Sequence, residues 1–101
     1  MLLEQFIDEE GKISSFYDSS NVLASKYDPK LKKLVVIFGK GNHYLYENVT
    51  QHSFDAFQKA NSQGNAIHAM IKEHHTTSLG PIDITNIKED ISNFKNKKKT
   101  K

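Results

Sequence analysis

Cysteine and arginine are both absent from this sequence of 101 residues. Without cysteine, the chain has no disulfide bond, no thiolate zinc site and no cysteine nucleophile, which agrees with a reducing, cytoplasmic compartment. Without arginine, all fourteen basic residues are lysine, and the planar forked donor that binds phosphate or guanine at two points is missing. The sequence therefore lacks the usual means of sequence-specific base reading.

Long apolar stretches are also missing, and the segment MLLEQFIDEEGK has acidic residues where a secretory signal has basic ones. We therefore expect neither secretion nor contact with a membrane. The length suits a single domain, because a chain of this size folds around one core. Abundant lysine, asparagine and isoleucine without arginine also suit an AT-rich genome, such as that of many phages.

The positive charge lies in two regions. Five of the fourteen lysines fall in the tail 95–101, and seven fall in residues 19–75 beside only four carboxylates and all five histidines. The basic centre favours an anionic partner. The tail suits either solubility or non-specific contact with phosphates.

Three short segments between residues 22 and 46 are typical of β-strands. Asp28 and Pro29 predict a turn, and the run Gly-Lys-Gly-Asn at 39–42 predicts another. We therefore expect an α+β fold built on a three-stranded antiparallel meander, with strands at 22–27, 34–38 and 43–46.

Two helices are predicted after the meander. Thr50 is a good N-cap, and Val49 with Phe54 has the spacing of a hydrophobic staple. Gly64 is placed to end this first helix in the left-handed conformation. The apolar spacing of a second helix, ending near residue 75, follows at Ile67, Met70 and Ile71.

The ends of the chain extend beyond this central unit. Residues 1–18 form an N-terminal extension with apolar residues at helical spacing, followed by a run that suits an extended segment. Residues 76–81 predict a loop, and apolar residues at 84, 87, 91 and 94 predict a further helix. The domain plan is therefore 1–18, a domain at 19–75, a loop and helix at 76–94, and a disordered Lys-rich tail at 95–101.

A family resemblance covers the central domain. It rests on the order of several short motifs: Ser19 to Val22, Tyr27-Asp28-Pro29, Tyr44-Leu45-Tyr46, Val49 and Ser62-Gln63-Gly64. This arrangement resembles the KTSC domain, a small domain found at the C-terminus of some lysyl-tRNA synthetases and as a free-standing protein. The resemblance implies the α+β fold and a role in RNA binding. It departs at Ile67-His68, where the family usually has an aromatic residue followed by Asn.

Tyr44 and Tyr46 are two residues apart on a predicted strand and therefore share one face. They form either a stacking platform for bases or a roof over the core that packs against the preceding strand. With nearby polar residues they make up the candidate ligand or nucleic-acid binding set, which is Tyr44, Tyr46, Tyr27, Lys30, Lys32, Lys33, Lys40, His43 and His68.

Catalytic and metal motifs are missing. His68, His74 and His75 lack the spacing of a metal-binding helix, and no HExxH pattern is present. No nucleophile elbow, P-loop or paired-carboxylate pattern occurs. We therefore expect no catalytic residue, no metal and no cofactor, and thus no enzyme.

Two functions fit these observations. The first is a non-catalytic small binding domain for RNA or a nucleotide-type ligand, with a small ligand held between the subunits of a homo-oligomer because one short chain has little volume for a pocket. The alternative is a protein-interaction module, such as a phage-encoded inhibitor or sequestering protein that acts on a host factor or a host nucleotide signal. In that case the segments at 1–18 and 84–94 contact the host protein.

Overall fold

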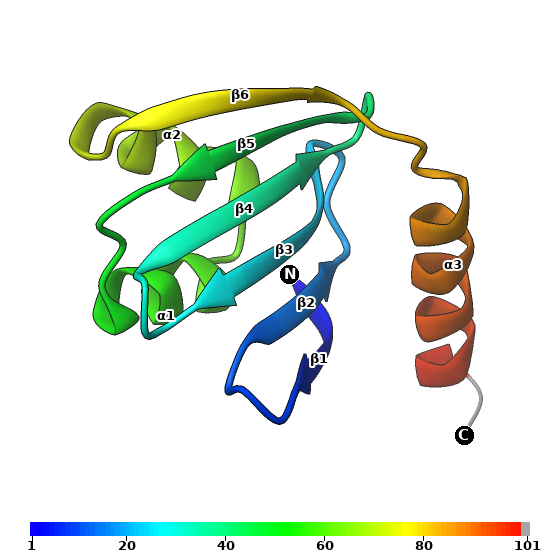
Figure 1. The fold of residues 1–101 in the computed structure, drawn as a ribbon. Helices are drawn as coiled ribbons and strands as arrows, with labels where there is room; N and C mark the ends of the chain where they lie inside the picture. The colour runs from blue at the N-terminus through cyan, green and yellow to red at the C-terminus, as the bar shows by residue number, and fades with distance from the viewer. Residues whose placement is uncertain (100–101) are drawn as a thin grey trace.

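One six-stranded antiparallel sheet dominates the computed structural model, which describes the backbone of residues 1–99 and the side chains of residues 1–70 and 74–97. The strands follow one another across the sheet in chain order (Figure 1). They are β1 (Leu2–Ile7), β2 (Ile13–Tyr17), β3 (Val22–Asp28), β4 (Lys33–Phe38), β5 (Asn42–Tyr46) and β6 (Thr76–Pro81).

The expectation of a three-stranded meander is therefore wrong, although the α+β class is correct. The predicted strands are present as β3, β4 and β5. The hairpin of β1 and β2 adds to the sheet beside β3, and β6 adds beside β5. The central three strands thus have partners on both sides.

The spacing of apolar residues in 2–7 suggests a helix, yet this segment is β1. Asp8 and Gly11 close the turn to β2, since Gly11 N donates to Asp8 O at 3.0 Å and Gly11 has a φ of 83°. Leu2 packs with the apolar cluster on one face of the sheet and Leu3 with the cluster on the other. Because both faces are covered, the alternation that marks a strand is hidden.

The segment 76–81 pairs with β5 and is an edge strand, where a loop was expected. Thr76 lies opposite Tyr46 and Thr77 opposite Leu45. The register shifts at Tyr44, and Gly80 has a φ of 84° near that shift. Mostly exposed side chains and a terminal Pro81 are typical of an edge strand, so the segment has little apolar signal.

Helices α1 (Gln51–Lys59) and α2 (Gln63–Glu73) cover one face of the sheet, here called the inner face. Thr50 is confirmed as the N-cap of α1, because Ser53 N donates to Thr50 Oγ1 at 3.1 Å. Val49 and Phe54 are both fully buried, as a hydrophobic staple requires. No described helix has the length and apolar character needed to cross a membrane.

Gly64 does not end α1, so that prediction is wrong. The helix ends at Lys59 with an extended Ala60 as its C-cap, and Gly64 lies in the first turn of α2 without a positive φ. A Cβ atom at Gly64 would lie 2.7 Å from Nδ2 of Asn21. The glycine therefore allows α2 to approach the loop before β3.

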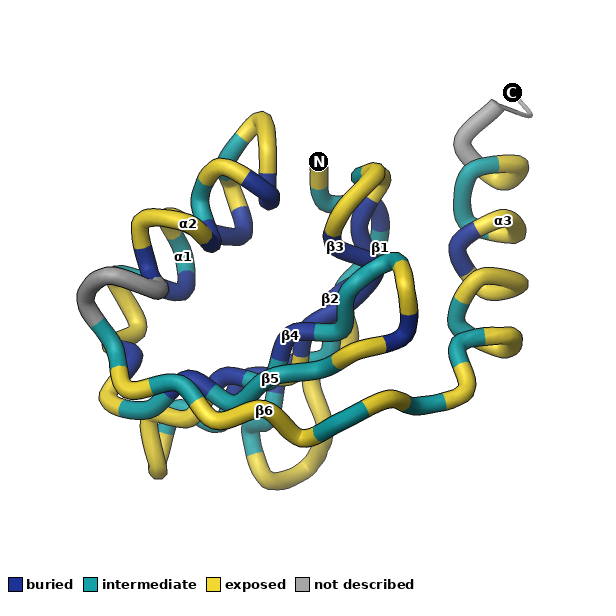
Figure 2. The backbone as a smooth tube through the Cα atoms, turned by 90° about the horizontal axis from the view of Figure 1, so that it is seen from above, coloured by how far each residue is buried: buried dark blue, intermediate teal, exposed yellow. Residues whose placement is uncertain are grey.

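Helix α3 (Thr85–Lys99) lies on the opposite, outer face (Figure 2). Its predicted apolar stripe at 84–94 packs there against Leu3, Leu23 and Ala24, with Ile91 only 7% exposed. Asp83 accepts hydrogen bonds from Thr85 N and Thr85 Oγ1, at 2.9 and 2.7 Å. The helix continues into the Lys-rich tail as far as residue 99, and residues 100–101 of that tail lie outside the described part of the chain.

Candidate functional site

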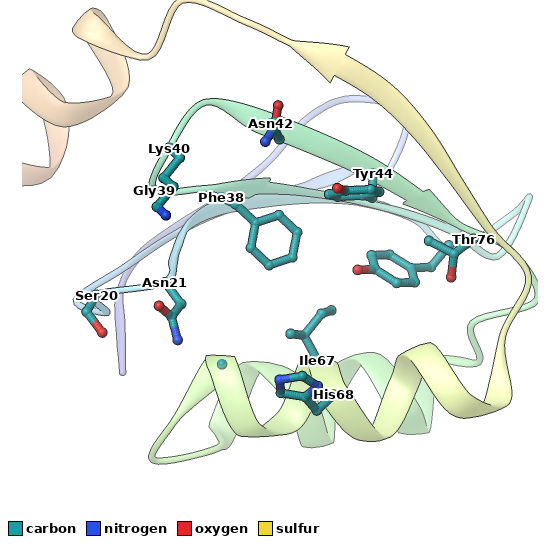
Figure 3. Close-up of a pocket in the computed structure, with 12 residues that line it drawn as sticks. Ser20, Asn21, Phe38, Gly39, Lys40, Asn42, Tyr44, Ile67, His68 and Thr76 are labelled. Atoms are coloured by element: carbon teal, nitrogen blue, oxygen red, sulfur yellow. The ribbon is translucent and has the colours of Figure 1, made fainter.

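A cavity of about 540 Å³ lies between α2 and the inner face of the sheet. Its volume falls within the range of pockets that hold small organic ligands. Figure 3 shows its lining, which comes from the loop before β3, the β4–β5 hairpin, α2 and the start of β6. The lining residues are Ser20, Asn21, Phe38, Gly39, Lys40, Asn42, Tyr44, Tyr46, Gly64, Ile67, His68 and Thr76.

The β4–β5 hairpin places the aromatic part of the lining. Tyr44 lies opposite Val36, and Tyr46 lies opposite Leu34, so both tyrosines face the helices as the shared-face prediction requires. Tyr46 is fully buried, whereas Tyr44 is partly buried. Tyr46 thus belongs to the core, and Tyr44 lies at its border, where it lines the cavity.

Phe38 and Tyr44 form one aromatic corner of the cavity. Their ring centroids are 5.4 Å apart and their planes are nearly perpendicular, at 84°. Ile67, only 3% exposed, points from α2 toward Phe38 across the cavity (Figure 3). A flat apolar ring that enters here meets aromatic and aliphatic surfaces on both sides.

The hydroxyl of Tyr46 is buried and has no hydrogen-bond partner among the described residues. Buried hydroxyls in folded proteins nearly always have such a partner, since an unsatisfied one costs about 1–3 kcal/mol. Burial, with a smaller contribution from nearby Tyr44, raises the pKa of Tyr46 to about 12. The group is therefore a neutral donor and acceptor at physiological pH.

The other end of the cavity is polar. Ser20, Asn21 and Lys40 are exposed there, at the opposite end from Tyr44 and Thr76 (Figure 3). Gly39 N donates to Asn21 O at 2.8 Å, which ties the hairpin turn to the loop before β3. Among the residues whose side chains the structure describes, no aspartate or glutamate lines the cavity, so Lys40 faces no carboxylate from this set.

The cavity brings together four of the residues proposed from the sequence, namely Tyr44, Tyr46, Lys40 and His68. Lys30, Lys32 and Lys33 lie instead in and beside the β3–β4 turn, at the opposite end of these strands from the 39–42 turn.

Two further candidates lie away from the cavity. Tyr27 is a core residue whose hydroxyl donates to Val49 O at 2.6 Å. His43 is one residue from Tyr44 in β5 and so points to the outer face, where its Nδ1 lies 2.7 Å from Gly80 O.

Several residues that line the cavity were not predicted as site residues from the sequence. Ser20 and Asn21 contribute to the family resemblance, and that was the available signal for them. Phe38 was assigned only to packing under the tyrosines, although it lies beside Tyr44 at the cavity. Thr76 carried no signal, because its segment was expected to be a loop rather than a strand beside Tyr46.

The histidines do not form a cluster. Within the described residues no three His, Asp or Glu side chains lie together as they do around a metal ion. His75 Nε2 lies 3.9 Å from Glu47 Oε2 at an exposed position, and His68 alone of the five lines the cavity.

Comparison with known proteins identifies the central region. A family model described as KTSC domain matches residues 18–75, which confirms the resemblance found in the sequence. A crystal structure of a KTSC domain protein from Yersinia pestis is similar, with a TM-score of 0.61 and 26% sequence identity over 66% of this chain and 96% of that one. No curated protein matches the chain.

Proposed function

The chain belongs to the KTSC domain family, and we propose that it is a non-catalytic binding domain whose cavity takes up a nucleobase from a nucleotide or from RNA. One observation carries this proposal. Tyr46 lines the aromatic cavity, and its buried hydroxyl has no hydrogen-bond partner among the described residues, so a ligand that reaches this hydroxyl supplies the missing hydrogen bond.

A nucleobase combines the two properties that the aromatic end of the cavity requires of a ligand. Its flat face suits the surfaces of Phe38, Tyr44 and Ile67, since base stacking on aromatic side chains contributes about 1–3 kcal/mol per base. Its edge carries carbonyl, amino and ring-nitrogen groups that can bond to the Tyr46 hydroxyl. A purely aliphatic ligand would leave that hydroxyl unsatisfied.

The chemistry of the lining supports binding rather than catalysis. Counting described side chains alone, the lining holds one imidazole, that of His68, and no carboxylate. Among the described residues, His68 makes no hydrogen bond to a hydroxyl, whereas an activated serine or threonine nucleophile needs such a bond to its base.

A protein-interaction role remains the alternative prediction, and one surface favours it. Ile7 and Leu31 are 63% and 64% exposed, and the strand register places both at the same end of the sheet. The segments expected to contact a partner also pack on each other, because Phe94 of α3 contacts Phe6 and Phe16 of the N-terminal hairpin. The end of the sheet that carries Ile7 and Leu31 is therefore a candidate surface for a protein partner.

The test is a titration of ¹⁵N-labelled full-length protein with the four nucleoside 5′-monophosphates and with hexanucleotide RNAs, followed by amide chemical shifts. We expect saturable shifts around Tyr44, Tyr46 and Ile67. Tighter binding of hexanucleotides identifies RNA as the source of the base, and equal or tighter binding of monophosphates identifies the free nucleotide. The absence of binding at millimolar concentrations of every probe would refute the proposal.

A further inference from the structure

We infer that the ligand is a nucleoside phosphate held in one direction, with its base at Tyr46 and its phosphate between Lys40 and Asn21. This inference rests on the proposed nucleobase function and adds the anionic half of the ligand. It assigns a role to the polar end of the cavity, which does not contact the stacked base.

The two ends of the cavity differ in chemistry and lie apart along β5. Tyr44 and Tyr46 follow Asn42 by two and four residues, which corresponds to about 7 and 13 Å at the rise of a strand. Phe38 and Ile67 lie between the aromatic end and the polar end (Figure 3). This separation suits the base and the phosphate of a single nucleotide.

The polar end presents side-chain donors that donate no hydrogen bond and form no ion pair to any described residue. Among the described residues, Lys40 forms no ion pair, and the side chains of Ser20 and Asn21 donate no hydrogen bond. By contrast, the nearby Ser19 Oγ accepts bonds from the backbone N–H groups of Asn21 and Val22. Lys40 and Asn21 are thus free to donate to an oxyanion.

The described lining of the cavity holds Lys40 and no carboxylate, which favours an anionic group at this end. A phosphate beside Lys40 is not repelled by an acidic side chain of this described lining. Lysine binds phosphate as a point charge, so the missing arginine does not prevent this contact.

Backbone hydrogen bonds fix the two segments that carry Asn21 and Lys40 before any ligand arrives. Gly39 N bonds to Asn21 O at 2.8 Å, and a Cβ at Gly39 would lie 3.0 Å from Ser20 O. Gly41 has a φ of 97° and its carbonyl accepts from Ile82 N at 2.7 Å. The turn and the loop before β3 therefore form one fixed unit, which lowers the entropy lost on binding.

The experiment compares each nucleoside with its 5′-monophosphate by isothermal titration calorimetry at 50 mM and 200 mM NaCl. We expect the monophosphate to bind about tenfold more tightly at low salt, and the advantage to shrink at high salt because the phosphate contact is screened. Lys40→Gln removes most of the advantage and leaves nucleoside affinity unchanged. Lys33→Gln is the matched control, since Lys33 is an exposed β4 lysine away from the cavity, and it leaves both affinities unchanged.

The outcomes separate this inference from the proposed function. Equal affinity for nucleoside and monophosphate overturns the phosphate site while the nucleobase function stands. Equal losses of monophosphate affinity in Lys40→Gln and Lys33→Gln also overturn the inference, because the loss then follows from the lower net charge of the protein rather than from a contact at the cavity. Failure of nucleosides and monophosphates alike to bind refutes this inference, and failure of the hexanucleotide RNAs as well refutes the proposed function. Binding of inorganic phosphate as tightly as monophosphate refutes recognition of the two halves together.

Discussion

The ring of Tyr27 lies parallel to the ring of Phe54, with centroids 4.4 Å apart and planes 11° from parallel. This stack joins β3 to α1 in the centre of the core. The Tyr27 hydroxyl donates to Val49 O, next to the N-cap of α1, so a family-motif tyrosine acts here as a structural residue. Tyr27 and Tyr46, two of the three buried tyrosines, therefore differ in one respect: the Tyr27 hydroxyl has a hydrogen-bond partner and the Tyr46 hydroxyl has none among the described residues.

Tyr27→Phe removes a satisfied hydrogen bond and leaves Val49 O buried without that donor. We expect the free energy of unfolding to fall by about 1–2 kcal/mol, measured by urea denaturation. Ligand affinity is expected to stay unchanged, because Tyr27 does not line the cavity. A loss of ligand affinity in a well-folded variant would contradict this assignment.

Tyr46→Phe is expected to change the free energy of unfolding in the opposite direction from Tyr27→Phe. It removes a buried hydroxyl with no partner among the described residues, so we expect the free energy of unfolding to stay equal or rise by about 1 kcal/mol. Nucleotide affinity should fall about three- to tenfold, measured by calorimetry. A variant that is destabilised and still binds normally would show that the hydroxyl serves the fold alone.

Gly64→Ala tests the contact between α2 and the loop before β3. The added Cβ would meet the end of the flexible Asn21 side chain at 2.7 Å and displace it from the polar end of the cavity. We expect a change in unfolding free energy within about 0.5 kcal/mol, because the moving group is exposed, and a several-fold loss of monophosphate affinity. Ala69→Gly, at an exposed position of the same helix, is the control for backbone effects and should leave affinity unchanged.

Stability should depend on alkaline pH through the buried tyrosines. Burial raises the pKa of Tyr17 and of Tyr46 from 10.0 to about 12, so each hydroxyl ionises more easily in the unfolded chain. Their contribution is fully present below pH 10 and is lost as the pH rises to about 12, by an amount on the order of 2 kcal/mol for each group.

Urea denaturation between pH 9 and pH 11.5 measures this loss, and Tyr17→Phe and Tyr46→Phe should each reduce the slope in that range. Only the difference in slope between each variant and the wild type is assigned to the tyrosine. An unchanged slope in both variants would show that neither hydroxyl titrates as proposed.

The central hairpin was predictable because its signals are local. The turn at 39–42, the branched run 34–38 and the N-cap Thr50 each act within a few residues, and each lies where expected. The apolar residues of β1 have the spacing of a helix rather than the alternation of a strand, because the strand is covered on both faces. β6 has almost no apolar signal, because its place is set by pairing with β5 across the intervening residues 47–75, which carry α1 and α2.

The cavity was predictable only in part for the same reason. Tyr44 and Tyr46 sit on one predicted strand, so their shared face follows from the period of two. Ile67, Asn21 and Thr76 come from three other segments, and only the packing of α2 against the sheet brings them to the tyrosines. The Lys30 to Lys33 turn looked equally basic, yet it lies at the far end of the strands.

The packing of Phe94 against Phe6 and Phe16 has a consequence for folding kinetics. Phe94 lies near the C-terminal end of the sequence, and Phe6 and Phe16 lie near its N-terminal end. Their contact therefore closes a loop that spans most of the chain, and closing it costs conformational entropy. Contacts of such high sequence separation form late, after the local hairpins and helices have reduced the search. We therefore expect the contacts of Phe94 on the outer face to form after the local hairpins and helices.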